Sequence, residues 1–289
     1  MIGLVLLALQ MQAALPSRPV ADAVAPRRPV VAVAGHPSLV GPSRTVVIDA
    51  GHGGVDPGMS GPIGARHKIY EKDVTLAVTL KLGKALKARG VKVVYTRTTD
   101  TLINLYDRGP IANEAHGDLF ISIHVNAANP KWQNAAAARG FETFFLSEAK
   151  TEDARRVEAM ENSAARYDTG TPTSKGDPLS FILNDMQQNE HLRESMKLAD
   201  AVQDELATVE PGPDRGVQQA GFVVLGTAFM PAVLVEIGFG SNRADAAYMT
   251  NPQSQTKLAG AIADAAVNYL NTYWAGVSGV ADRTSGGHP

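Results

Sequence analysis

The sequence predicts an α/β protein, a single domain built on a mixed, mostly parallel sheet of about six strands flanked by helices. Short apolar runs rich in Val and Ile alternate with longer amphipathic segments. This alternation is expected of strands joined by crossover helices. Clusters of Gly and Pro separate the segments and mark the loops between them.

The composition is that of a folded protein without strong charge. The chain has 289 residues, of which 44% are hydrophobic and 19% are charged, so a substantial core is expected. The formal net charge is -2 and no long run of one sign occurs, which argues against nucleic-acid binding. Cysteine is absent from the sequence, which excludes disulfides, thiolate metal sites and a cysteine nucleophile.

Both ends of the chain are predicted to lie outside the folded domain, which then covers residues 44–275. Residues 1–14 hold an apolar run that is too short to span a bilayer and indicates a signal peptide, although no Lys or Arg precedes it. Residues 15–43, rich in Pro, Ala and Val, predict a flexible linker, and residues 276–289 predict a disordered tail. We therefore expect an exported protein without a stable membrane span, located in the periplasm or alternatively released from the cell.

The first half of the domain alternates strands with helices. The β-branched run after Arg44 predicts a buried strand, and a glycine-rich loop follows it. Val74, Val78 and Leu82 share one face of the next helix, and Gly90 fits its C-terminal cap. The predicted elements are a strand at 45–48, a helix at 73–88, a strand at 91–95, a helix at 105–115 and a strand at 119–124.

The second half is predicted from similar patterns. The segment 148–167 is charged and rich in Ala, which favours a helix, and Leu258, Ile262 and Ala266 repeat at helical spacing near the C-terminus. The predicted elements are a strand at 140–146, a helix at 148–167, a loop at 168–178, helices near 179–187 and 191–207, strands at 221–225 and 232–235, and a helix at 252–274.

Three predicted strands end in residues that can do chemistry, namely His52, His124 and Glu236. Sites in open α/β sheets form outside the carboxyl ends of the strands, so neighbouring parallel strands would bring these side chains together. Glu71, where the glycine-rich loop meets the first helix, can fold back to the same edge. Taken singly, each histidine could cap backbone groups, and Glu71 could be a carboxylate favoured by the helix dipole.

Taken together, the four residues favour a metal site. Two histidines and one carboxylate form a catalytic zinc set that leaves one coordination position for water. A further glutamate that does not bind the metal would be available as a general base. Glu236 lies between Val235 and Ile237, where an unpaired carboxylate would be costly unless it had a function.

Four separate motifs resemble those of the amidase 3 type of N-acetylmuramoyl-L-alanine amidase, a family of zinc enzymes used in cell separation. The motifs are DAGHGGVDPG from Asp49, EKDV from Glu71, ISIHVN from Ile121 and VEIGFGSN from Val235. They occur in the family's order, and the resemblance extends from Thr45 to about Trp274.

The resemblance implies that His52, Glu71 and His124 bind Zn²⁺ and that Glu236 is the catalytic glutamate. It also implies a substrate, the peptidoglycan amide between N-acetylmuramic acid and L-alanine, and we expect a monomeric enzyme. Two alternatives are a non-catalytic wall-binding module and a zinc peptidase that shortens stem peptides. The segment 63–70 is slightly long for the family, and Gly240 replaces a bulkier apolar residue.

Residues 149–189 correspond to an insertion that regulates cell-division members of this family. In those members a helix blocks the zinc with a glutamate until an activator protein pulls the helix away. The resemblance thus suggests that Glu161, or Glu158 as second choice, is an autoinhibitory ligand. The alternative is an ordinary solvated helical face.

Several other polar residues receive structural interpretations. Asp49 and Asn126 flank the histidines and could orient them or form turn hydrogen bonds. Arg97 is predicted to form an ion pair near Asp100 or Asp107. Other histidines are predicted to be solvated, to cap helices or to lie in disordered segments; they are His36, His67, His116, His191 and His288.

Overall fold

The computed structural model describes residues 35–169 and 186–285 of the chain. The strands are β1 (Thr45–Ala50), β2 (Ser60–Gly61), β3 (Ile69–Tyr70), β4 (Lys92–Tyr95), β5 (Leu119–Asn126), β6 (Phe141–Leu146), β7 (Asp214–Ala220) and β8 (Ala232–Phe239). The α-helices are α1 (Glu71–Ala88), α2 (Leu105–Glu114), α3 (Glu152–Asn162), α5 (Met186–Leu206), α6 (Val223–Gly226), α7 (Arg243–Thr250) and α8 (Pro252–Ser285). Two 3₁₀ turns, η1 (Ala135–Ala137) and η2 (Ser163–Tyr167), complete the described elements.

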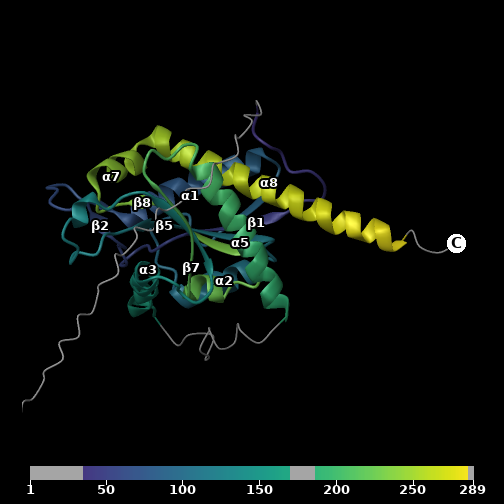
Figure 1. Ribbon diagram of the computed structural model, residues 1–289, viewed down its shortest axis with the longest axis horizontal. Helices are drawn as coiled ribbons and strands as arrows, with labels where there is room; N and C mark the ends of the chain where they lie inside the picture. The colour runs from purple at the N-terminus through teal and green to yellow at the C-terminus, as the bar shows by residue number, and fades with distance from the viewer. Residues whose placement is uncertain (1–34, 170–185, 286–289) are drawn as a thin grey trace, which may run out of the picture. The chain divides into compact units, whose positions relative to one another are not determined.

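The described residues form a six-stranded sheet in the order β4-β1-β5-β8-β6-β7 (Figure 1). Neighbouring strands are parallel except β6 and β8, which pair antiparallel. This confirms the prediction of a single α/β domain with a mixed, mostly parallel sheet. The central strands β1, β5 and β8 are adjacent and parallel, so their carboxyl ends meet at one edge.

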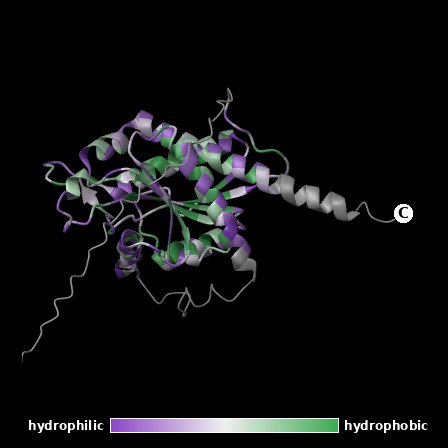
Figure 2. Cartoon of the chain, viewed as in Figure 1, coloured by the Kyte–Doolittle hydropathy of each residue, from purple (hydrophilic) through white to green (hydrophobic). Residues whose placement is uncertain are grey.

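Helices cover both faces of the sheet, and each face has its own hydrophobic cluster. One cluster joins the sheet to α1, α5 and α8, and the other joins it to α2, α3 and α6. Figure 2 shows hydrophobic colour along the strands and hydrophilic colour on the outer sides of the helices. Along β5, Ile121 and Ile123 face the first cluster, whereas alternation turns Ser122, His124 and Asn126 toward the second.

The predicted strand at 221–225 is wrong. Residues 223–226 form helix α6, and the strand of this region is β7, which ends just before the helix and pairs with β6 at the edge of the sheet. Phe222, Val224 and Leu225 are buried in the α2–α3 side of the core. A short apolar run fits a buried helical turn as well as a strand, and the polar edge strand β7 carries no apolar signal.

The segment around α3 differs from the single helix predicted at 148–167. The α-helix begins after Thr151, whose side chain accepts a hydrogen bond from the Ala154 N–H at 3.0 Å, and η2 follows it. The second of the two later helices is confirmed as part of α5. Residues 170–185, which contain most of the predicted loop and of the helix near 179–187, lie outside the described residues.

Contacts of the described residues extend past both ends of the range 44–275 expected for the domain. Before residue 44, His36 Nδ1 lies 2.9 Å from Asp264 Oδ2 and the Leu39 N–H donates to Arg89 O at 2.8 Å. Helix α8 continues to Ser285, past the predicted start of the disordered tail, because glycines at 276 and 279 weaken a helix without ending it. Within the described residues, no helix is both long and apolar enough to cross a membrane.

Candidate metal centre

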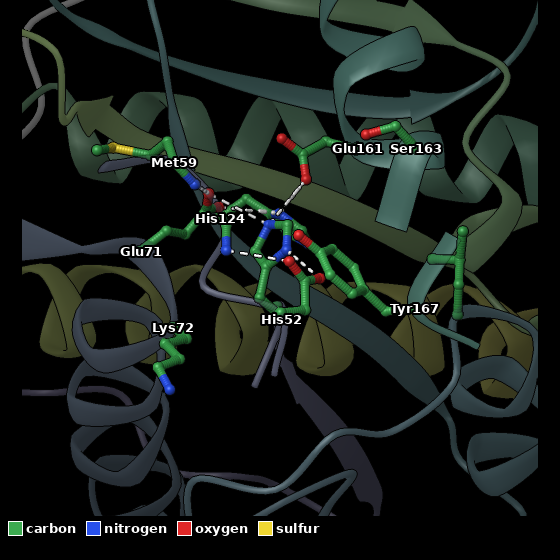
Figure 3. A network of polar contacts seen from close by, with 12 residues as sticks. His52, Met59, Glu71, Lys72, His124, Glu161, Ser163 and Tyr167 are labelled. Carbon is green, nitrogen blue, oxygen red and sulfur yellow. Dashed lines mark hydrogen bonds and ion pairs between the residues drawn. The ribbon is translucent and has the colours of Figure 1, made fainter. Parts of the chain in front are cut away.

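Four side chains from different elements converge at the carboxyl edge of the sheet. His52, Glu71, His124 and Glu161 are buried, and each offers one ligand atom within 4.8 Å of the others. Figure 3 shows both imidazoles meeting the carboxylates, while Lys72 points away from the group. The edge therefore brings together the three residues predicted to bind metal and the residue predicted to block it.

Backbone geometry after β1 directs His52 into the group. His52 has a φ of 61°, in the left-handed region that residues other than glycine rarely adopt. Two glycines make room for the ligands: a Cβ on Gly51 would meet the His124 ring at 2.6 Å, and one on Gly58 would meet Glu71 Oε2 at 2.6 Å. The ligand side chains approach the backbone so closely at these two positions that only glycine fits there.

Asp56 orients His52. Its Oδ2 accepts a hydrogen bond from His52 Nδ1 at 2.7 Å, which turns Nε2 toward the carboxylates. Asp49 hydrogen-bonds neither histidine among the described residues; its carboxylate pairs with Arg108 and accepts hydrogen bonds from the hydroxyls of Thr96 and Ser122. Asp56 was not among the residues predicted from the sequence. It lies in a turn four residues after His52, and this short separation was the available signal.

Two further polar residues have structural roles. Asn126 binds Glu142 and Arg156 among the described residues, and it does not contact His124. Arg97 forms no ion pair of the predicted kind in the described part of the chain. Its guanidinium instead donates to the carbonyl oxygens of Ala50, Gly51 and Lys72, and so ties the end of β1 to the first turn of α1.

Glu71 is held by backbone groups from two segments. The Met59 N–H donates to Oε2 and the Val125 N–H donates to Oε1, each at 2.8 Å. The Met59 sulfur also fills the space that a Cβ on Gly240 would need, which accounts for the small residue at that position. At the end of the segment 63–70, Ile69–Tyr70 forms β3, which pairs antiparallel with β2, and Glu71 follows directly.

The charges of the cluster favour a cation. Burial by itself lowers the pKa of His52, but Glu71, Asp56 and Glu161 outweigh it and raise that pKa well above its ordinary value. In the same way, burial is overcome by Glu161 and Glu71 at His124, whose pKa rises to about 10. Burial by itself raises the pKa of Glu71, but His52 and His124 outweigh burial and bring that pKa below its ordinary value.

At Glu236, no contact outweighs the effect of burial on the pKa. It is fully buried in β8, in register with His124 of β5. Neither of its oxygens has a hydrogen-bond partner among the described residues. Burial and the nearby charge of Glu161 raise the pKa of Glu236 well above its ordinary value. A carboxyl group in this setting is prepared to hold a proton beside the cluster.

Helix α3 places Glu161 in the cluster. Glu161 Oε2 lies 2.8 Å from His124 Nδ1 and 3.1 Å from His52 Nε2. Glu158, the second choice, instead accepts a hydrogen bond from the Gly221 N–H at 2.8 Å. The cavity left beside the cluster has a volume of about 10 Å³, enough for one water molecule at most.

The donor set fits zinc. Zinc bonds of about 2.0–2.1 Å in tetrahedral geometry hold ligand atoms about 3.3 Å apart. The imidazole nitrogens lie 2.8 to 3.2 Å from the oxygens of Glu71 and Glu161. Glu161 Oε1 is buried and has no hydrogen-bond partner among the described residues, as expected where a cation completes the site. Of the other histidines, His67 and His116 are exposed and lie outside the cluster.

Comparisons with known proteins agree with this geometry. A family model described as N-acetylmuramoyl-L-alanine amidase matches residues 46–268. The N-acetylmuramoyl-L-alanine amidase AmiA of Escherichia coli (strain K12) is 34% identical over 236 residues, 81% of this chain and 78% of AmiA. The crystal structure of N-acetylmuramoyl-L-alanine amidase from Clostridium difficile 630 is similar with 30% identity and a TM-score of 0.58, covering 79% of this chain and 97% of that one. The chain therefore belongs to the N-acetylmuramoyl-L-alanine amidase family.

Proposed function

We propose that the protein hydrolyses the amide between N-acetylmuramic acid and L-alanine in peptidoglycan, with a zinc ion held by His52, Glu71 and His124. The observation that carries the proposal is the convergence of these ligands within 4.8 Å at the edge where Glu236 is also buried. Zinc, when bound, supplies a Lewis acid that polarises a carbonyl and acidifies water.

Glu236 is proposed as the group that moves the proton. Its carboxylate takes a proton from the attacking water and delivers it to the amide nitrogen, which leaves as the amine of L-alanine. Its position in register with His124 and its lack of hydrogen-bond partners among the described residues support this role.

Digestion of purified sacculi followed by mass spectrometry tests the reaction. An amidase releases intact stem peptides with N-terminal L-alanine and leaves glycan strands bare. Shortened stems would instead indicate a zinc peptidase, and no release even by Glu161→Ala would indicate a wall-binding module. Activity that survives a chelator, or full activity of Glu236→Gln, would contradict the metal mechanism.

The closed arrangement supports a second part of the proposal, that α3 autoinhibits the enzyme. Glu161 occupies the place beside both imidazoles where substrate would bind, and about 10 Å³ of free volume cannot admit a sugar linked to a peptide. A partner protein that withdraws α3 would open the site. We also propose that the enzyme is exported and acts in wall remodelling or the separation of daughter cells, as the predicted signal peptide suggests.

Substituting Glu161 tests autoinhibition. Glu161→Ala removes the carboxylate that contacts His52 and His124, so basal hydrolysis of sacculi should rise. Glu158→Ala is the matched control for loss of one α3 carboxylate without loss of a cluster ligand. If Glu161→Ala binds zinc normally and its basal rate stays at the wild-type value, the blocking role is wrong.

A further inference from the structure

Helix α3 places a second side chain at the sheet edge besides Glu161. Arg156 donates to Ala127 O at 2.7 Å and to Asn126 Oδ1 at 3.1 Å. Its guanidinium carbon lies 5.2 Å from the centre of the Trp132 ring. These three partners all belong to the end of β5 and the loop after it, and together we call them the cation cage.

The cation cage lies close to the candidate metal centre. Asn126 follows His124 by two residues on β5, so both side chains lie on the same face about 7 Å apart. On α3, Arg156 precedes Glu161 by five residues, which is about 7.5 Å along the helix axis. A substrate whose scissile amide lies at the metal centre can therefore reach the cage.

The cage presents acceptors and an aromatic face. Glu142 Oε1 accepts a hydrogen bond from Asn126 Nδ2 at 2.6 Å, which turns Asn126 Oδ1 toward the guanidinium. Glu142 itself is buried and is paired with Arg215. A carbonyl oxygen, an amide oxygen and the face of an indole are the groups that bind an organic cation. None of them belongs to α3, so all of them stay when α3 moves.

We propose that the cation cage is a substrate subsite for an ammonium group on the stem peptide, such as the side-chain amine of a diamino acid. When α3 is closed, Arg156 occupies the subsite in the same way that Glu161 occupies the metal centre. The helix thus imitates two parts of the substrate, a cation and an oxygen ligand. This inference rests on the proposed amidase function and assigns the subsite its ligand class.

Peptide binding tests the subsite without turnover. Arg156→Gln empties the cage, and Trp274→Phe in the same chain leaves Trp132 as its single tryptophan. A free stem peptide with an unmodified side-chain amine should change Trp132 fluorescence and bind about tenfold more tightly than the same peptide acetylated at that amine. Arg155→Gln, an equal charge change on the exposed side of α3, is the control and should show little binding because Arg156 still fills the cage.

Kinetics on soluble muropeptides provide the second measurement. In Arg156→Gln, acetylation of the amine should raise KM about tenfold with little change in kcat, and Trp132→Ala should abolish that difference while Trp132→Phe keeps it. Equal binding and equal KM for both peptides would overturn the subsite. A KM that rises equally for both peptides in Trp132→Ala would also overturn it, because Trp132 would then stack on a sugar. Selective binding by Arg156→Gln, with no hydrolysis even after Glu161→Ala is added, would support the subsite and contradict the proposed amidase function instead.

Discussion

At the scale of single residues, environment separates functional side chains from identical ones elsewhere. His52 and His67 lie in the same glycine-containing region, yet only His52 is buried and bonded to a carboxylate. Glu71 and Glu236 are both buried glutamates, but Glu71 accepts two backbone N–H bonds and Glu236 accepts none among the described residues. These contacts, more than residue type, assign one glutamate to the metal and the other to the proton.

Asp56 is expected to matter for metal affinity. Asp56→Asn keeps the size of the side chain but weakens its hold on His52 Nδ1, so zinc affinity should fall by about 10–100-fold. Competition with a chromogenic chelator measures the affinity, and Asp204→Asn, an exposed carboxylate on α5, is the control. Unchanged zinc affinity in Asp56→Asn would show that the hydrogen bond does not orient the ligand.

Glu210 gives stability a pH dependence. Burial, with a smaller effect of Asp245, raises the pKa of Glu210 to about 7. A raised carboxyl pKa means that the folded state holds the proton more tightly, so stability is fully present below about pH 4.5 and is lost as pH rises through 7. Glu210→Gln should match the wild type near pH 4.5 and exceed it by up to roughly 3 kcal/mol above pH 7.5. Denaturant unfolding at several pH values measures this, and a difference that is constant with pH would contradict it.

At the scale of elements, the strands carry most of the site residues, and the proposed autoinhibition assigns the movable part to α3. β1, β5 and β8 lie side by side in the sheet, each with its site residue at or near the carboxyl end. Helix α3 instead packs over the site through a few buried residues, Ala154, Val157 and Glu161, and polar contacts near its two ends. A short helix held in this way can leave without unfolding the sheet.

The N-terminal cap of α3 offers a mild way to test its release. Thr151→Ala removes the side-chain acceptor for the Ala154 N–H, which costs a helix about 1 kcal/mol. If α3 must leave before catalysis, basal hydrolysis of sacculi should rise up to about fivefold. Thr208→Ala, an exposed threonine just after α5, is the control. A basal rate equal to that of the control would indicate that closure of α3 does not limit activity.

At the scale of the whole molecule, the net charge is close to zero while the site concentrates carboxylates. The formal net charge is -2, yet Glu71, Glu161 and Glu236 lie buried around two imidazoles. Bringing these carboxylates together opposes folding unless positive charge compensates them, either from protons on the imidazoles or from a bound cation. The proposed zinc ion is thus expected to stabilise the fold as well as to serve the reaction.

Zinc should therefore raise the unfolding temperature. Free zinc at 100 times its dissociation constant would stabilise the folded state by about 2.7 kcal/mol if the unfolded chain does not bind it. Thermal unfolding of Glu236→Gln with and without zinc measures the effect, and magnesium, which prefers oxygen ligands, should have little effect. Removing a ligand with His124→Ala should remove the response. An unfolding temperature indifferent to zinc would contradict the metal site.

The sequence by itself determined the fold class and the four residues expected at the sheet edge, His52, Glu71, His124 and Glu236. Periodicity and the ends of strands are local properties that neighbouring residues encode. The identification of β7 failed because an edge strand with polar residues lacks that periodicity. Only the tertiary structure decided that Asp56 rather than Asp49 contacts His52, that Met59 fills the space beside Gly240, and that Glu161 rather than Glu158 reaches the cluster. These facts depend on a left-handed turn at His52 and on the packing of α3 across the sheet. The packing of α3 is set by contacts between segments distant in the chain, which no local pattern of residues encodes.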